Sequence, residues 1–531
     1  MDAPVGIVDL FSGPGGLGEG FSAVRLRDGT RAFEIDLSVE KDPVAHATLR
    51  LRAFLRRFDD GCPREYVDFL NGNTANEPNW AALYPHQWAA AGQEALNLKL
   101  GDEETRPTLS RRLSRIRKKR GDRIVLIGGP PCQAYSLAGR GRKPGYKGYV
   151  PHPEDRHLLY REYISILREL RPAAFVMENV KGMLSSRIEG RSVFDLVAGD
   201  LKSGGGSTEY QLFPLERQGT FRRSHASKDF LVHSERHGVP QARHRVIIVG
   251  IRRDLSMNLR EDLLPKLDGS LGGASVRQVI GGMPVLRSKL SSRQGDRDVP
   301  DEWARIVRNH AARLNATPVD LDLAKRSNFA AILEGVRPND AMIHSGSVGD
   351  TEMPSSCPAR LRDWLCDPSL RRLTLHETRA HMKEDLERYL FASCWSAATG
   401  TSPKARDFPQ RLAPKHANWT SGHYKDRFRV QVWDSPSSTV TCHVSKDGHS
   451  TIHPDPCQCR SLTVREAARL QTFPDNYFFK GNRTQQYIQV GNAVPPFLAL
   501  QIGEALLPAL AAVLGLEREP SVEGTPVEEV A

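Results

Sequence analysis

The chain has 531 residues, of which 39% are hydrophobic and 26% charged, so it is long enough for two or more domains with their own cores. It carries 74 Lys and Arg against 63 Asp and Glu, a formal net charge of +11, which favours an acidic polymer such as nucleic acid as partner but also fits a basic soluble enzyme. The eight scattered cysteines favour a reducing cytosol over a disulfide framework, and we expect neither a signal peptide nor a membrane span.

A glycine-rich loop follows the first predicted strand, residues 5–10. Gly13, Gly15 and Gly18 fit the pattern G-x-G-x-x-G, which lets a backbone turn tightly and approach a ligand closely. A second strand is predicted over 33–39 and ends in Glu40, an acid placed where it can bind ribose hydroxyls. Together these features predict an adenosine-bearing cofactor, and they leave open whether it is a nicotinamide cofactor or S-adenosylmethionine.

Three helices are predicted after this unit. Asp42 and Pro43 begin the first, which is expected to end near Phe58. Residues 85–100 are predicted to be helical, with Gly101 as the stop. The third, around 109–120, carries a run of Arg and Lys that we interpret as a solvated face, because it precedes a strand and ligands gather at the carboxyl ends of strands.

A buried strand is predicted over 124–127, and two glycines and two prolines break it just before Cys132. A cysteine at the carboxyl end of a parallel strand lies where open α/β sheets bind ligands, although a small buried cysteine under a tight turn fits the pattern too. The polar stretch 137–153 is interpreted as a mobile lid whose Arg140 and Lys143 contact phosphate. A neighbouring strand, 173–177, is expected to place Glu178 at the same edge of the sheet. The alternative is that Glu178 is an ordinary exposed residue of a loop, which is the commoner position for a glutamate.

These motifs, taken in order, resemble the bacterial-type DNA (cytosine-5)-methyltransferases. The resemblance covers the chain from about Val5 to Ile502, apart from insertions. It rests on six segments: the loop Phe11–Gly16, Pro130-Pro131-Cys132-Gln133, Glu178-Asn179-Val180, Gln241-Ala242-Arg243-His244-Arg245, Leu462–Pro474 and Gln489–Pro496.

The resemblance implies an α/β fold: a doubly wound, mostly parallel S-adenosylmethionine-dependent methyltransferase sheet with an inserted smaller target-recognition domain. The catalytic domain is expected over 1–252 and completed by 486–515. The recognition domain and a return helix are expected over 253–485, and a disordered tail over 516–531. Recognition of DNA would then lie in the irregular region up to Cys459, through loops that read base edges in the major groove.

The same resemblance assigns the chemistry. The thiolate of Cys132 is expected to add to C6 of a flipped-out cytosine, so that C5 can attack the methyl group. Glu178 is expected to protonate or hydrogen-bond N3, and Arg243 and Arg245 to hold the base carbonyl and nearby carboxylates. The residues expected to bind S-adenosylmethionine are Phe11, Ser12, Gly13, Gly15, Gly16, Leu17, Glu40, Pro131, Asn492 and Val494.

Some positions depart from the family pattern or carry weaker predictions. Lys41 stands where a bulky apolar residue is common, and the acid that usually meets the adenine amino group cannot be placed within 59–121. Two hairpin-like stretches are predicted, over 428–433 and 438–444. The Cys and His residues between 442 and 459 fit no usual zinc spacing, so no metal site is expected.

The expected function is therefore methylation of cytosine C5 in a specific duplex DNA sequence. The alternatives are a cytosine-5 RNA methyltransferase, a catalytically inactive DNA-binding relative and, from the glycine loop alone, a nicotinamide-dependent dehydrogenase. The resemblance further implies a monomer of the bacterial cytoplasm, associated with the nucleoid and without membrane contact. A cognate restriction endonuclease acting separately is an expected partner.

Overall fold

The computed structural model describes residues 4–59, 61–131, 153–188, 190–204, 208–216, 225–291, 298–338, 341–346, 353–414, 419 and 427–516. Cys132, the stretch 137–152 and the residues after 516 therefore lie outside the described residues, and the predictions of a nucleophile, a lid and a disordered tail are untested there.

A central sheet organises the larger part of the molecule, with strand order β3-β2-β1-β4-β5-β11-β8 and β9 paired to β11. The strands from β3 to β5 run parallel, and β11 is antiparallel to β5, β8 and β9. The fold class expected from the sequence, a doubly wound and mostly parallel sheet, is confirmed. The strands are β1 (Val5–Leu10), β2 (Phe33–Glu40), β3 (Ala95–Asn97), β4 (Ile124–Gly128), β5 (Ala174–Val180), β8 (Tyr210–Phe213), β9 (Leu231–His233) and β11 (His244–Arg252).

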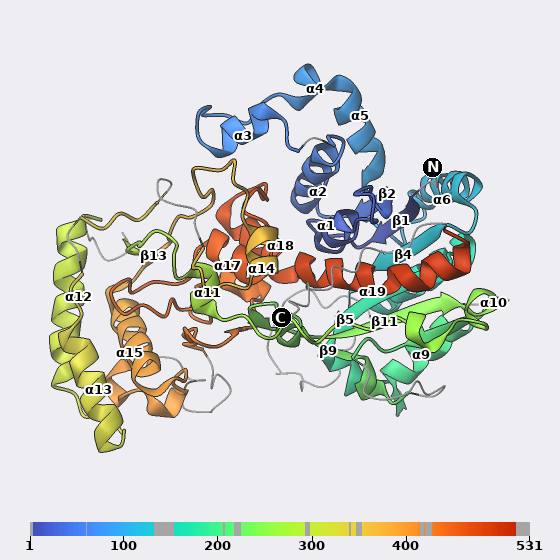
Figure 1. Ribbon diagram of the computed structural model, residues 1–531. Helices are drawn as coiled ribbons and strands as arrows, with labels where there is room; N and C mark the ends of the chain where they lie inside the picture. The colour runs from blue at the N-terminus through green and yellow to red at the C-terminus, as the bar shows by residue number, and fades with distance from the viewer. Residues whose placement is uncertain are drawn as a thin grey trace, which may run out of the picture.

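Helices cover both faces of this sheet, because nearly every residue of the inner strands is apolar and buried. One face packs against α1 (Gly16–Ala23) and α19 (Pro496–Leu514), and the other against α6 (Arg106–Arg120), α8 (Pro153–Leu170) and α9 (Val193–Lys202). Figure 1 shows α19 crossing the sheet, which brings the end of the chain back onto the first domain. Helix α2 (Pro43–Leu55) begins as expected, with the Asp42 carboxylate accepting hydrogen bonds from the amides of Val44 and Ala45.

Residues 61–94 form a small helical insertion with its own aromatic cluster. It consists of α3 (Arg64–Leu70), α4 (Trp80–Leu83) and α5 (Pro85–Glu94), which pack on α2 through Phe54, Tyr66 and Trp80. The predicted helix over 85–100 is too long, because the chain leaves α5 at Ala95 to form the edge strand β3.

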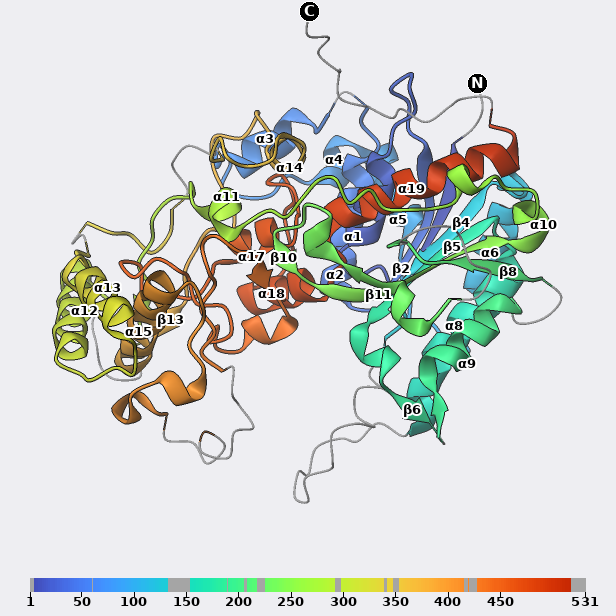
Figure 2. The same ribbon diagram turned by 60° about the horizontal axis from the view of Figure 1, so that its bottom comes forward.

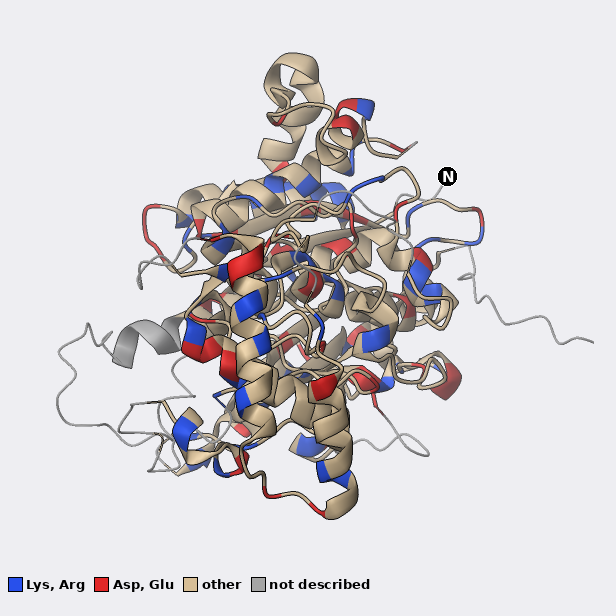
Figure 3. Ribbon diagram, turned by 90° about the vertical axis from the view of Figure 1, so that its left-hand side faces the viewer, with Lys and Arg blue, Asp and Glu red and all other residues tan. Residues whose placement is uncertain are grey.

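A second unit has a separate hydrophobic core (Figure 2). Its helices are α12 (Pro300–Asn315), α13 (Leu323–Glu334) and α15 (Lys383–Thr399). Figure 3, a ribbon view that faces this end of the molecule, shows basic and acidic residues interspersed along its helices and loops. The segments around α11 (Val276–Ile280) and α14 (Ala359–Leu365) lie inside the predicted recognition domain, yet they pack in the core of the large unit. The predicted boundary at 253 therefore cuts through one continuous core, whereas the separate core begins near Leu290.

The carboxyl-terminal helices α17 (Val464–Leu470), α18 (Arg483–Asn492) and α19 lie between the two units and on the sheet. Among the described residues, the stretch Arg483–Leu514 is long and apolar enough to cross a membrane, contrary to the expectation that no such run exists. However, 61% of its apolar window is buried inside the protein, and α19 packs against α1, so the apolar residues have a core to fill.

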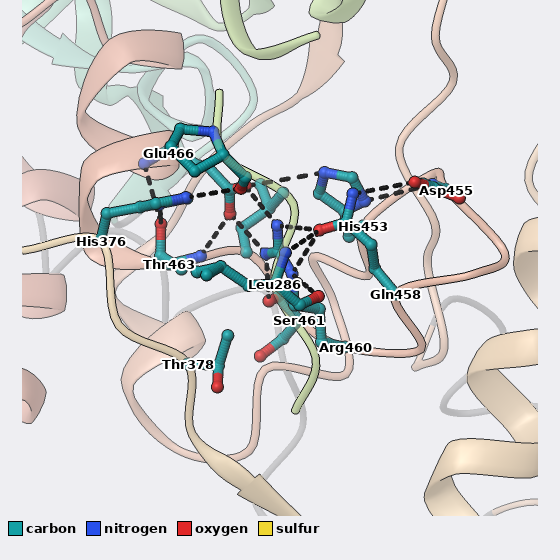
Figure 4. A network of polar contacts seen from close by, with 12 residues as sticks. Leu286, His376, Thr378, His453, Asp455, Gln458, Arg460, Ser461, Thr463 and Glu466 are labelled. Carbon is teal, nitrogen blue, oxygen red and sulfur yellow. Dashed lines mark hydrogen bonds and ion pairs between the residues drawn. The ribbon is translucent and has the colours of Figure 1, made fainter. Parts of the chain in front are cut away.

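A buried polar network ties the second unit to α17 (Figure 4). Arg460 donates to both carboxylate oxygens of Glu466, at 2.7 and 2.6 Å, and each side chain is 1% exposed. Glu466 also accepts a hydrogen bond from the Thr463 amide, which begins α17, while a ring nitrogen of His376 contacts the Thr463 hydroxyl at 3.0 Å. Because a buried pair of charges is costly to separate, this network favours one fixed junction between the units.

The two predicted hairpins are wrong. Ser437 and Ser438 form the short strand β14 (Ser437–Ser438), which runs parallel to β10 (Gln241–Ala242) in the large unit, and residues 442–445 form a 3-10 turn. Val430 makes only an isolated parallel bridge, to Ile452. Val440 and Val444 are instead buried in the core of the large unit, a tertiary contact that local sequence cannot reveal.

Candidate active site

A carboxylate and a guanidinium meet at the carboxyl end of β5. Glu178 lies near the end of that strand and Arg245 near the start of β11, which pairs with it antiparallel. The Nε atom of Arg245 lies 2.9 Å from Oε1 of Glu178, and both side chains are 14% exposed. The pair is thus shielded from water but remains accessible from the edge of the sheet where ligands bind in open α/β folds.

The turn after β4 is held against this pair. An ideal Cβ on Gly129 would lie 2.8 Å from Oε2 of Glu178, closer than real Cβ contacts allow, so any side chain at this position would displace the carboxylate. The side-chain amide of Asn179 also donates to the Pro130 carbonyl at 3.3 Å. Cys132 lies outside the described residues, and Pro131, next to it in sequence, is the last described residue of this turn.

Arg243 lies near the pair but is engaged differently from Arg245. It is 2% exposed, and its two terminal nitrogens donate to the carbonyls of Val440 and Gly491 at 2.9 and 3.0 Å. Burial, and then the neighbouring charge of Arg245, lower the pKa of this guanidinium. The sequence predicts the same role for both arginines, but the structure places them differently. Arg245 contacts the carboxylate of Glu178, whereas Arg243 connects its own segment of backbone to those of Val440 and Gly491.

The glycine loop has the backbone geometry that its sequence predicts. Gly13 and Gly15 adopt φ of 57° and 103°, and Phe11, which is not a glycine, adopts φ of 56°. Backbone strain in a non-glycine residue is typical of binding loops. An ideal Cβ on Gly16 would lie 2.3 Å from the Val494 carbonyl oxygen, so the loop and the closing segment of the chain are in direct contact.

Glu40 lies beside this loop, as the sequence predicts. One oxygen of its carboxylate accepts a hydrogen bond from the Gly13 amide at 2.9 Å and the other from the Asp42 amide at 2.7 Å. Each carboxylate oxygen has a second lone pair that can accept a ribose hydroxyl. Asn492, at the end of α18, is exposed and belongs to the same closing segment as Val494. The residues present thus fit an adenosine-bearing cofactor with polar groups at its ribose.

Sequence reasoning missed a buried carboxyl group beneath the loop. Asp9 on β1 is 0% exposed, and neither of its carboxyl oxygens accepts a hydrogen bond within the described part of the chain. Burial is the main cause that raises the pKa of Asp9 to about 8. The signal was present in the sequence, as a single acid inside an otherwise apolar strand.

No group of three or more His, Cys, Asp or Glu side chains in the described ranges is arranged to hold a metal ion. His453, one of the residues considered for zinc, is buried, and its ring lies 3.6 Å from Glu466 and accepts a hydrogen bond from the Asp455 amide.

The sheet, the glycine loop with its acid, and the buried carboxylate–guanidinium pair define an α/β transferase with an adenosine-bearing cosubstrate. Residues 112–507 match the family model for C-5 cytosine-specific DNA methylases, and the chain belongs to that family. It is therefore a DNA (cytosine-5)-methyltransferase that uses S-adenosylmethionine and acts on double-stranded DNA, which confirms the resemblance, the cofactor and the reaction inferred from the sequence.

Named relatives agree with this assignment. The chain is 32% identical to the Type II methyltransferase M.Bpa9945I of Bacillus paralicheniformis, over 94% of this chain and 98% of that protein. It is 27% identical to M.AgeI of Thalassovita gelatinovora, over 73% and 83% of the two chains, and 25% identical to M.XorII of Xanthomonas oryzae, over 96% and 86%. The family membership decides against the nicotinamide-dependent and RNA-directed alternatives.

Proposed function

We propose that Cys132, Glu178 and Arg245 form the site that receives the flipped-out cytosine. The observation that carries this proposal is the close approach of Gly129 to the Glu178 carboxylate, which brings the turn that leads into Cys132 directly beside the ion pair. Cys132 follows that turn directly, so its thiolate would attack C6 from the turn side.

Glu178 then has the position to handle the proton at N3 of the base. As the thiolate adds to C6, electron density moves toward N3, and a carboxyl group there stabilises the developing charge. The Nε of Arg245 is in ion-pair contact with the carboxylate, and its Nη1 donates to the His244 carbonyl at 2.8 Å. Its remaining terminal N–H groups are the donors proposed for the cytosine carbonyl oxygen.

The glycine loop is the proposed cofactor site. S-adenosylmethionine supplies the electrophilic methyl group. Glu40 would accept the ribose hydroxyls, and the loop amides would face the polar end of the ligand. The remaining contacts proposed from the sequence motifs are Phe11, Ser12, Gly13, Gly15, Gly16, Leu17, Pro131, Asn492 and Val494.

The biological setting is proposed from the relatives. Their names are those of Type II methyltransferases, so this enzyme is proposed to methylate one specific sequence and to have a separately acting restriction endonuclease as its counterpart. It is proposed to act as a monomer on the chromosome in the bacterial cytoplasm.

Covalent trapping tests the proposed nucleophile. With 5-fluorocytosine at the target position, methyl transfer to C5 leaves a fluorine where a proton must depart, so the enzyme should stay bound to the DNA. We expect a denaturant-resistant complex that requires S-adenosylmethionine and is absent in Cys132→Ala. The matched control is Cys62→Ala, because Cys62 is a half-buried thiol in the helical insertion, outside the proposed site. The covalent complex should persist in this variant. An adduct on any cysteine other than Cys132 would refute the assignment, and no adduct in the wild type would favour an inactive relative.

A further inference from the structure

Tyr477 contacts the cofactor loop from the far end of the chain. Its side chain is fully buried in the segment after α17, and its hydroxyl donates a hydrogen bond to the Pro14 carbonyl. An ideal Cβ on Gly15 would lie 3.2 Å from the same hydroxyl oxygen. The phenol therefore lies directly against the turn in which Gly15 adopts its left-handed conformation and begins α1.

Charged residues hold the phenol ring in place. The guanidinium of Arg52 lies over the Tyr477 ring at 4.4 Å from its centroid and forms a buried ion pair with Glu19 of α1. Arg52 also donates to the side-chain oxygen of Asn476 at 3.3 Å. The ring, the loop and helices α1 and α2 are thus fixed relative to one another by contacts that exclude water.

The helical insertion supports this arrangement from behind. Tyr66 donates its hydroxyl to the Asn476 carbonyl at 2.7 Å, and the rings of Phe69 and Phe478 lie 5.1 Å apart. Glu77 forms an ion pair with Lys480. The insertion, to which the sequence assigned no role, therefore contacts the residues that precede and follow Tyr477 in the sequence.

We propose that Tyr477 is a positioning residue for S-adenosylmethionine, fixing the Pro14–Gly15 turn in the conformation that binds the cofactor, with the insertion as its support. This inference rests on the proposed cofactor site at the glycine loop. Without the hydroxyl, the Pro14 carbonyl is buried with one hydrogen bond fewer, and the turn gains freedom to move away from the binding conformation. Cofactor affinity should fall although Tyr477 itself contacts only the loop.

The test compares Tyr477→Phe with Tyr210→Phe. Tyr210 is a matched control, because it is also buried and donates its hydroxyl to a proline carbonyl, that of Pro172, at 3.0 Å on the edge strand β8. For each variant, calorimetry measures the affinity for S-adenosylmethionine, thermal unfolding measures stability, and hydrogen exchange measures the amides of residues 12–19.

We expect Tyr477→Phe to weaken cofactor binding about five- to tenfold, the loss of one hydrogen bond. It should also speed exchange in residues 12–19 and raise the KM for the cofactor more than that for DNA. Tyr210→Phe should lose comparable stability with affinity unchanged. The variant Glu40→Ala distinguishes a failure of the positioning role of Tyr477 from a failure of the proposed cofactor site. If Glu40→Ala weakens binding and Tyr477→Phe does not, the positioning role is wrong. If Glu40→Ala also leaves the affinity unchanged, the proposed cofactor site itself is wrong.

Discussion

Glu178 and Arg245 face each other across two antiparallel strands, with Nε 2.9 Å from Oε1 at the edge of the sheet where the Gly-Pro-Pro turn ends. This single ion-pair contact engages Oε1, and the second oxygen, Oε2, lies on the side of Gly129. In the proposed site, a base bound at this edge of the sheet meets an oxygen of the Glu178 carboxylate, as proton transfer at a ring nitrogen requires.

Glu178→Gln is expected to lower kcat about 100- to 1,000-fold, because the amide keeps the shape of the side chain but cannot transfer a proton. Single-turnover methylation of target DNA measures this, with cofactor affinity as the check on folding. Glu235→Gln is the matched control, since Glu235 also pairs with a β11 side chain, its Oε1 lying 2.7 Å from Nε2 of His244. A Glu178→Gln enzyme within threefold of the wild-type rate would remove Glu178 from the proposed chemistry.

Gly129→Ala is expected to reduce kcat at least tenfold with little change in thermal stability. The added methyl group would meet Oε2 of Glu178 at 2.8 Å, so the carboxylate must move away from the base. The control is Gly199→Ala on α9, where an added Cβ meets no atom within 4 Å and alanine favours the helix. Equal activity in the two variants would show that the carboxylate does not need its observed position.

Asp9 gives the large domain a pH-dependent stability. The folded chain keeps this proton up to about pH 8, whereas an unfolded Asp releases it near 3.8, so folding takes up a proton between these values. The contribution of Asp9 to the free energy of unfolding should therefore fall as pH rises through this window and level off above it. Relative to the wild type, Asp9→Asn should gain about 2 kcal/mol between about pH 6 and pH 8.

Denaturant unfolding at several pH values measures this difference. Asp363→Asn is the control, because its side chain is 72% exposed and its replacement should leave the pH dependence unchanged. A constant difference between Asp9→Asn and the wild type across the range would mean that Asp9 is ionised in the folded protein.

The sequence predicted those parts of the fold that local pattern determines. Strands β1, β4 and β5 read as mostly apolar runs because nearly all of their residues are buried, and the glycine loop follows from the φ values it needs. The motif Gln-x-Arg-x-Arg, in contrast, could not show that Arg243 turns toward the carbonyls of Val440 and Gly491 while Arg245 turns toward Glu178. The carbonyl partners of Arg243 lie 197 and 248 residues further along the chain, and Glu178 lies on another strand. Both choices are set by tertiary packing, as is the conformation of the Thr-Val stretch that was mistaken for a hairpin.

The second unit, which the sequence predicts to read the DNA, should be exchangeable between relatives only if the exchanged segments follow its own hydrophobic core. Residues 290–342 and 380–430 include most of that core, whereas Val276, Ile280, Leu361 and Leu365 belong to the core of the large unit. We expect a chimera that takes 290–342 and 380–430 from a relative with another target to fold, to form the 5-fluorocytosine complex and to methylate the relative's sequence.

A chimera exchanged over 255–455 in one piece replaces the four large-unit residues as well and should lose thermal stability or fail to fold. Bisulfite sequencing of DNA from expressing cells identifies the methylated site. If the two-segment chimera folds and still methylates the original sequence, target recognition lies outside the second unit.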